Sequence, residues 1–291
     1  MTSEMPTFAL SYATAFYGTD PDRLVTAARL AEECGFEALY VPEHVALYPG
    51  AKIGEWEVPA DLEFLDPLDV LTFVAAHTER LLLGTAVLLL PYHNPVTLAK
   101  RLATIDVLSR GRMRLLGIGV GGLPGEAAAV GVDFRTRGRR ADEAIEVMRR
   151  LWADEASGAT FEGEFFHLDR VFSYPKPLAG AGLPIHVGGS SEAAARRAGR
   201  VGDGWFPGGA LNDAERQTLW DLVRATAEKA GRDPDSIAYM RTGSLEMSTE
   251  YAERLAAQGV TRVVVGAPAG EADEQRAQLV EFAERFGLGD R

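Results

Sequence analysis

The stretch PIHVGGSSEAAARRAGRVGDGWFP, residues 184–207, holds two short apolar runs on either side of a glycine pair, a serine pair and an alanine-rich segment. It predicts a strand, a tight turn, a helix that Ser190 and Ser191 can cap, and a second strand. Gly188 and Gly189 have no Cβ, so an anion can approach the backbone where the free N–H groups of the helix begin. On these residues alone, a phosphate seat and an ordinary strand-to-helix turn are equally good interpretations.

The rest of the chain repeats this alternation. Apolar runs predict strands at 7–16, 36–42, 80–90, 112–120, 185–188, 204–207, 236–242 and 260–266. Helical patterns lie between them, at 21–35, 67–78, 96–109, 138–152, 212–231, 249–258 and 271–286, besides the one in the opening stretch. This order predicts one closed parallel (β/α)8 barrel, a TIM barrel, as a single domain over 1–291. Residues 154–182 break the alternation, and we interpret them as an insertion between the fourth and fifth strands that holds a hairpin near 161–165.

The composition restricts the partners and the compartment. With 46% hydrophobic and 25% charged residues, the chain has the make-up of a globular protein with a full core. Its formal net charge of −12 argues against nucleic acid and anionic membranes. The N-terminus has no signal-like pattern, and Cys34, the one cysteine, lies on an apolar helical face and is expected to be buried. A cytoplasmic enzyme or binding protein acting on a small molecule is the expectation.

In a barrel of this kind the active site lies at the C-terminal ends of the strands. That rule collects His44, 86–94, 117–122, 188–191 and 207–209 on one rim, with the long polar segment 46–66 as a loop over the site. A rim histidine can polarise a substrate or move a proton near neutral pH. The alternative is a structural His44 that Glu43 or the backbone satisfies.

Three other patterns carry less weight. The sequence Gly117-x-Gly119-x-x-Gly122 matches the dinucleotide fingerprint, but no second strand ends in an acidic residue about 20 positions later. These glycines either make room for a flat ligand or turn the chain. No metal-binding or serine-hydrolase motif occurs, so no metal is expected. Four arginines precede the helix near 138, and either Asp142 and Glu143 or an anionic ligand compensates them: Arg135, Arg137, Arg139 and Arg140.

Four segments together resemble the bacterial luciferase-like flavin and deazaflavin oxidoreductases, in particular the F420-dependent branch. They are VPEH (41–44), GTAVLLLPYHNPVTLAK (84–100), SRGRMRLLGIGVG (109–121) and the opening stretch. The resemblance implies a bulge with a cis peptide at Ala86–Val87 behind the cofactor ring. It also implies a phosphate cradle at Gly188, Gly189, Ser190 and Ser191, and further cofactor contacts at Gly119 and Val120. A homodimer is expected by analogy alone.

The resemblance also suggests the reaction. His44 matches a strand-end histidine that lies beside the reacting ring carbon in sugar-phosphate-oxidising relatives. The substrate is expected under the loop 46–66, near Tyr48, Trp56, His93 and Trp205. Two departures matter: Gly122 stands where those relatives have an acidic residue, and Val120 stands where luciferase has an arginine near the flavin phosphate. Oxidation of a sugar phosphate is therefore disfavoured, and FMN mildly so.

The leading prediction is hydride transfer between coenzyme F420 and an unidentified organic molecule. The alternatives are an FMN-dependent monooxygenase that uses O₂, a non-catalytic flavin-binding protein with an occluded pocket, and a phosphate-binding isomerase barrel. A titration of the apoprotein with F420 and FMN separates the first two.

Overall fold

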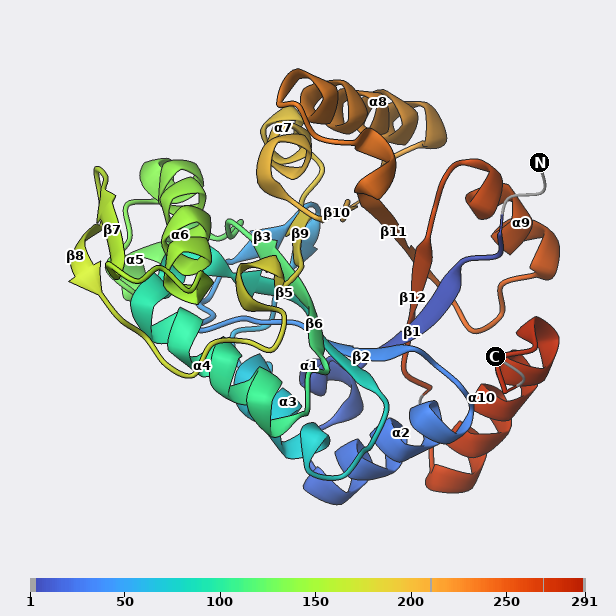
Figure 1. Cartoon of the computed structure of the whole chain (residues 1–291). Coiled ribbons are helices and arrows are strands. Elements are labelled where there is room, and N and C mark those ends of the chain that lie inside the picture. The colour runs from blue at the N-terminus through green and yellow to red at the C-terminus, as the bar shows by residue number, and fades with distance from the viewer. Residues whose placement is uncertain (1–3, 210, 269, 290–291) are drawn as a thin grey trace.

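The computed structural model describes residues 4–209, 211–268 and 270–289. Within these ranges, eight parallel strands form a closed barrel in the order β1-β12-β11-β10-β9-β6-β5-β2, and β1 pairs with β2 to complete the circle (Figure 1). These strands are β1 (Thr7–Ser11), β2 (Ala38–Val41), β5 (Leu82–Leu89), β6 (Met113–Gly119), β9 (Ile185–Gly188), β10 (Gly204–Phe206), β11 (Ala238–Gly243) and β12 (Arg262–Gly266). The predicted TIM barrel is confirmed.

A helix follows each barrel strand and packs outside it (Figure 1). These helices are α2 (Pro21–Glu33), α3 (Pro67–Ala75), α4 (Pro95–Leu108), α6 (Arg137–Trp152), α7 (Glu192–Val201), α8 (Asp213–Lys229), α9 (Thr249–Ala257) and α10 (Ala272–Phe286). Asp20, Asp66 and Asn94 cap α2, α3 and α4, and each is followed by a proline at the first helical position. Because a capping residue followed by proline is typical of a helix N-terminus, these helix starts can be predicted from the sequence. None of the helices described is both long and apolar enough to cross a bilayer.

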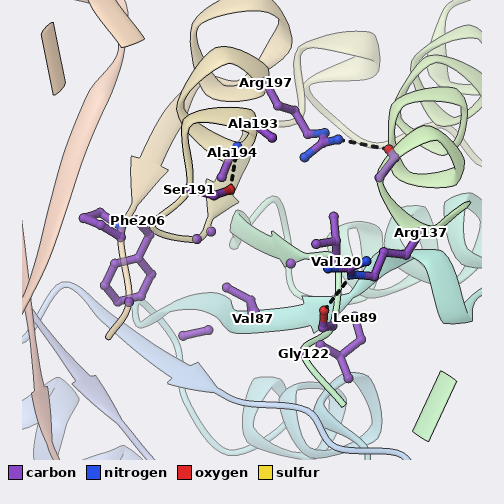
Figure 2. Close-up of a pocket in the computed structure, with 18 of the residues that line it drawn as sticks. Val87, Leu89, Val120, Gly122, Arg137, Ser191, Ala193, Ala194, Arg197 and Phe206 are labelled. Carbon is purple, nitrogen blue, oxygen red and sulfur yellow. Dashed lines mark hydrogen bonds between the residues drawn. The ribbon is translucent and has the colours of Figure 1, made fainter. Parts of the chain in front are cut away.

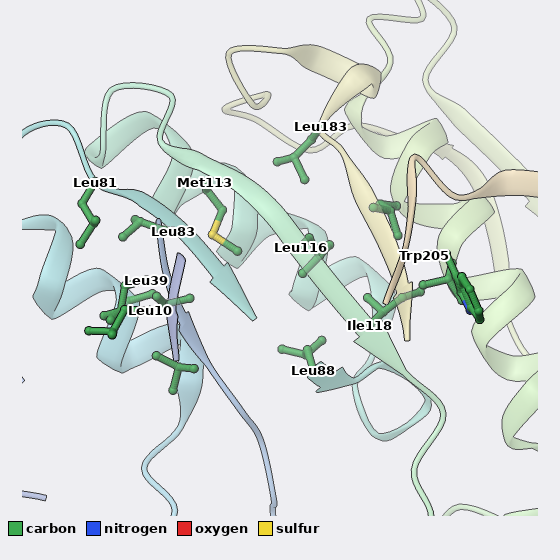
Figure 3. Close-up of a cluster of buried hydrophobic side chains, with 14 of the residues drawn as sticks. Leu10, Leu39, Leu81, Leu83, Leu88, Met113, Leu116, Ile118, Leu183 and Trp205 are labelled. Carbon is green, nitrogen blue, oxygen red and sulfur yellow. The ribbon is translucent and has the colours of Figure 1, made fainter. Parts of the chain in front are cut away.

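The main core lies between the barrel and its helices. Alternate strand residues such as Leu39, Leu83 and Leu116 are fully buried and pack with apolar residues of the surrounding helices (Figure 3). A smaller apolar cluster, which includes Tyr40 and Met240, fills the inside of the barrel. Cys34 is buried as predicted, and burial raises the pKa of its thiol.

The first expected strand differs in the structure. The first strand ends at Ser11, and Thr14–Tyr17 forms a short helix, α1, instead of continuing the strand. The reason is a long-range contact: the buried hydroxyl of Thr14 donates to the Glu63 carbonyl at 2.9 Å and accepts from the Leu65 N–H at 3.0 Å. The chain therefore turns aside to hold the end of the segment 46–66.

The segment 46–66 is partly ordered by its own small core. It contains the two-stranded hairpin β3 (Lys52–Ile53) and β4 (Trp56–Glu57). Ala51 and Val58 are buried against Leu123, which precedes the short helix α5 (Pro124–Ala129). In the insertion, β7 (Ala159–Glu162) and β8 (His167–Val171) pair antiparallel, so the predicted hairpin is confirmed.

Candidate active site

A cavity of about 620 Å³ opens at the C-terminal ends of the barrel strands. The ends of β5, β6, β9 and β10 reach it, together with the beginnings of α6 and α7 (Figure 2). Of the predicted cofactor contacts, all except Ser190 line it: Ala86, Val87, Gly119, Val120, Gly188, Gly189 and Ser191. Strands far apart in the sequence therefore meet at one apolar chamber, of the size that ligand pockets in proteins usually have.

The floor of the cavity is a bulge in β5. The peptide bond between Ala86 and Val87 is cis, as the family resemblance implies, and the pairing of β5 with β6 shifts register between Thr85 and Leu88. Neighbouring glycines make room for the bulge. A Cβ on Gly117 would lie 2.0 Å from the Thr85 carbonyl oxygen, and one on Gly188 would lie 2.7 Å from Cγ1 of Val87. Gly117 and Gly188 therefore accommodate the neighbouring strand, a role that the sequence did not suggest, whereas Gly119 and Gly122 line the cavity.

The turn between β9 and α7 has the features of an anion seat. Ser191 caps α7, because its Oγ accepts from the Ala194 N–H at 3.2 Å, and Ala193 and Ala194 line the cavity at the helix start. Gly189 has a φ of +118°, which favours glycine. The first N–H groups of a helix have no partner within the helix, so α7 presents donors toward the chamber. The hydroxyl of Ser190 donates instead to the Gly208 carbonyl.

Trp205 does not line the cavity, which corrects its expected place in the substrate pocket. Its side chain is fully buried outside the barrel, stacked on Tyr239 and Trp220 with ring centroids 5.1 and 6.1 Å away. Phe206 points into the chamber (Figure 2). Successive strand residues face opposite sides, so Trp205 points away from it. Trp205 nevertheless contacts the turn between β9 and α7, because its indole N–H donates to the Gly189 carbonyl at 3.1 Å.

His44 follows β2 at the same end of the barrel but is not among the residues that line the cavity, and it is paired with a buried carboxylate that sequence reasoning missed. Its Nδ1 is 3.2 Å from both carboxylate oxygens of Glu126, which is fully buried on α5. Glu126 also accepts from the Val45 N–H at 2.7 Å. The partner expected from the sequence was Glu43 or the backbone. The signal that could have found Glu126 is its position as the acidic residue in the first turn of the helix after β6.

Glu43 instead connects two strand ends. Its buried carboxylate accepts from the Leu89 N–H at 2.5 Å and lies 2.9 Å from Nε2 of His93. Leu89 lines the cavity, so this carboxylate fixes the turn that carries His44 against the strand that carries the bulge. His93 therefore has a structural partner and is not among the residues that line the cavity.

The other two predicted pocket residues also lie off the cavity. Tyr48 packs on Gly125, whose N–H its hydroxyl oxygen accepts at 3.2 Å. Trp56 is 44% exposed on the β3–β4 hairpin and packs near Phe16, with ring centroids 6.2 Å apart. Both belong to the segment 46–66, so they line its own packing surfaces and not the chamber.

Tyr92 lies beside the His44 pair. Burial raises the pKa of Tyr92 to about 12, and the negative charge of Glu126 adds to the shift. The phenol is therefore neutral at physiological pH. A Cβ on Gly121 would lie 2.2 Å from its hydroxyl oxygen, so the glycine lets the chain after β6 pass close to the hydroxyl end of the ring.

One end of the cavity is basic. Arg135, Arg137 and Arg197 line it there, beside the start of α6. Asp142 and Glu143 of α6 were candidates to compensate the charge of the four arginines at 135–140, but both have other partners. Asp142 binds Arg197 and Arg200, and Glu143 accepts from backbone N–H groups of the insertion hairpin.

The sequence is similar to those of known proteins. A family model described as luciferase-like monooxygenase matches residues 5–287. An F420-dependent glucose-6-phosphate dehydrogenase from Kineococcus radiotolerans is 31% identical over 286 residues, which cover 97% of this chain and 79% of that protein. An uncharacterized protein from Mycobacterium tuberculosis is 35% identical over 282 residues, which cover 91% of this chain and 95% of that protein.

Solved structures share the fold. The monooxygenase RslO1 from Streptomyces bottropensis aligns with a TM-score of 0.76 at 23% identity, over 98% of this chain and 100% of that one. An F420-dependent secondary alcohol dehydrogenase, in complex with an F420-acetone adduct, aligns with a TM-score of 0.74 at 17% identity, over 98% of this chain and 99% of that one. At these identities the likeness concerns the fold.

Proposed function

The chain belongs to the luciferase-like monooxygenase family, and from this premise we propose that it is an oxidoreductase that transfers a hydride between coenzyme F420 and a small organic molecule. The observation that carries the proposal is the shape of the chamber. An apolar floor at Ala86–Val87 adjoins helix N–H donors at the start of α7.

The residues present fit such a cofactor. The floor and Phe206 offer apolar surface to a tricyclic ring, and the first N–H groups of α7 lie beside the chamber, where a phosphate can approach them. When bound, the deazaflavin supplies or accepts the hydride. The protein contributes the orientation of the ring, the phosphate donors and an acid–base side chain.

That side chain is His44. Glu126 already accepts from the Val45 N–H, so we assign the proton on Nδ1 of His44 as donated to the same carboxylate. Nε2 is then the nitrogen that exchanges a proton with substrate: it accepts one when the ring is neutral and donates one when it is protonated. Glu126 fixes this tautomer and the ring orientation, the role that a carboxylate plays behind a catalytic histidine.

The proposed substrate needs only one acid–base group. Gly122, which lines the cavity, has no side chain to act as the second acid–base group of alcohol-oxidising relatives, and Glu126 lies behind His44 on its Nδ1 side. We therefore do not transfer the glucose-6-phosphate activity of the Kineococcus relative to this chain. We propose an imine or a conjugated alkene as the hydride acceptor, because reduction of a carbonyl would be the reverse of the alcohol oxidation set aside above.

A second candidate is an FMN-dependent monooxygenase. The same floor and phosphate seat suit FMN, and the fold neighbour from Streptomyces is a monooxygenase. Val120 lines the chamber where luciferase carries an arginine, which favours F420, as do the F420-dependent relatives.

The deciding experiment is a titration of the apoprotein with F420 and with FMN, in which binding is monitored by tryptophan fluorescence quenching and by cofactor absorbance. We expect tighter F420 binding and no oxygen consumption by the reduced complex, because deazaflavin reacts poorly with O₂. Preferential FMN binding together with oxygen uptake would establish the monooxygenase instead.

A further inference from the structure

The basic end of the chamber carries a charge that the described protein does not neutralise. Arg137 is the first residue of α6 and lines the cavity on the side opposite Phe206 (Figure 2). The first turn of α6 contains no acidic residue. A cation at a helix N-terminus is unfavourable, because it adds to the positive end of the helix dipole.

The guanidinium of Arg137 is held in place by neutral groups. Nε donates to the Gly121 carbonyl at 3.2 Å and Nη1 to the Phe134 carbonyl at 2.7 Å, while Cζ lies 3.7 Å from the centroid of the Phe134 ring. Carbonyl oxygens and an aromatic face orient the group and leave its full charge. In the described ranges, no hydrogen bond uses Nη2 and no carboxylate pairs with Arg137.

Neighbouring arginines are different. Arg139, two residues along the same helix, makes two hydrogen bonds of 3.0 and 2.9 Å with Glu164. Arg197 binds Asp142 at 2.8 and 3.1 Å. The chain has 42 acidic residues against 30 basic ones, so a carboxylate partner for Arg137 is not hard to supply. Because Arg137 lines the chamber without a carboxylate partner among the described residues, its position points to an anion from outside the protein.

We infer that Arg137 and the start of α6 form a second anion seat, for a carboxylate or phosphate that the cofactor carries beyond the phosphate held at α7. This inference rests on the proposed function. F420 continues past its phosphate into a lactyl group and a chain of glutamates, whereas FMN ends at its phosphate. A guanidinium suits this task, because its planar fork binds a carboxylate with two parallel bonds. The second seat would make the protein selective for the glutamylated coenzyme.

The test uses three ligands with the full-length protein: the deazaflavin chromophore without phosphate, F420 without glutamates, and glutamylated F420. Dissociation constants come from fluorescence titrations at low and high salt. For the wild type we expect affinity to rise at each step. For Arg137→Gln we expect about tenfold weaker binding of the glutamylated form and changes of less than about twofold for the other two ligands. The tenfold effect should shrink at high salt.

Two further variants make the result specific. Arg139→Gln removes a cation from the same helix that does not line the cavity, so its binding constants should match the wild type. Arg137→Lys keeps the charge but loses the fork, so it should fall between the wild type and Arg137→Gln, and its thermal unfolding tests whether position 137 also affects folding.

Distinct outcomes separate this inference from the proposed function. If Arg137→Gln weakens F420 without glutamates as much as the glutamylated form, Arg137 contacts the first phosphate and there is no second seat. Equal wild-type affinity for those two ligands would also overturn the inference. If the wild type binds none of the three and binds FMN, the proposed function fails first.

Discussion

The side chain of Val87 lies in the space that a side chain at Gly119 would need. A Cβ built on Gly119 would be 2.6 Å from Cγ2 of Val87, closer than carbon atoms can pack. The two residues belong to adjacent strands, β5 and β6, and both line the chamber. The glycine at the end of β6 is therefore a condition for the bulge that forms the cavity floor.

This relationship predicts a rescue. Gly119→Ala should lower the free energy of unfolding by about 1–3 kcal/mol and weaken cofactor binding, because the stiff β-branched Val87 has no room to move aside. Val87→Ala in the same chain should restore most of the binding, since it removes the clashing methyl. Gly117→Ala is the matched control: its Cβ would meet the backbone oxygen of Thr85, so Val87→Ala cannot rescue it. Denaturant unfolding and cofactor titration of the two single and two double variants, compared with the wild type, check this. Wild-type behaviour of Gly119→Ala would disprove the account.

Local signals predict the fold well and the site less well. The alternation of apolar runs with capped helices predicts the barrel, because the apolar pattern that buries each strand or helix face lies within the residues of that element. The first strand, predicted over 7–16 and observed at Thr7–Ser11, shows the limit of such local signals. The turn at Thr14 is set by contacts with Glu63 and Leu65, about fifty positions away.

The same limit applies to the candidate site. The glycines of β6 are adjusted to Val87 on another strand, and His44 is oriented by Glu126 from another helix. Trp205 has an inward neighbour, Phe206, and one residue of register decides which of them faces the ligand. The cis bond at Ala86–Val87 was predicted only through family resemblance. Spacing within a segment does not encode such pairings.

His44 is predicted to act on substrate and not on cofactor binding. His44→Ala should lower turnover by about a hundredfold or more, the usual scale of general acid–base catalysis, and change the cofactor dissociation constant only a few-fold. Steady-state kinetics and a cofactor titration on the same preparation measure the two quantities. Unchanged turnover would remove His44 from the mechanism.

Glu126 is predicted to act through His44. Glu126→Gln should lower kcat by about tenfold, because the amide can present an NH₂ group to Nδ1 and favour the wrong tautomer. KM and cofactor affinity should change little. The double variant with His44→Ala should be no slower than His44→Ala alone, since residues that act as a unit are not additive. Additive losses in that cycle would mean that Glu126 has a separate role.

Trp205 is predicted to position the phosphate turn. Trp205→Phe keeps an aromatic ring in the stack but removes the donor to the Gly189 carbonyl, so cofactor affinity should fall by about fivefold, the worth of one hydrogen bond. Trp220→Phe alters the same stack without touching the turn. It should lower the unfolding temperature and leave cofactor affinity unchanged. Equal losses of affinity in both variants would indicate a general packing effect.

His186 is predicted to make the fold sensitive to acid. Its side chain on β9 is 4% exposed, and burial lowers the pKa to about 4 from an ordinary 6.5, with Arg262 adding to the shift and Asp203 and Glu37 opposing it. Between those two pH values the unfolded chain binds a proton that the folded chain does not. The free energy of unfolding should therefore fall as the pH falls through this window, by up to about 3 kcal/mol, and this contribution should level off below the folded pKa. His186→Gln removes the titrating group, so the difference between wild type and variant isolates it from the carboxylates that both chains share. Urea unfolding across the window measures that difference, and a difference that stays constant with pH would show that His186 is protonated equally in both states.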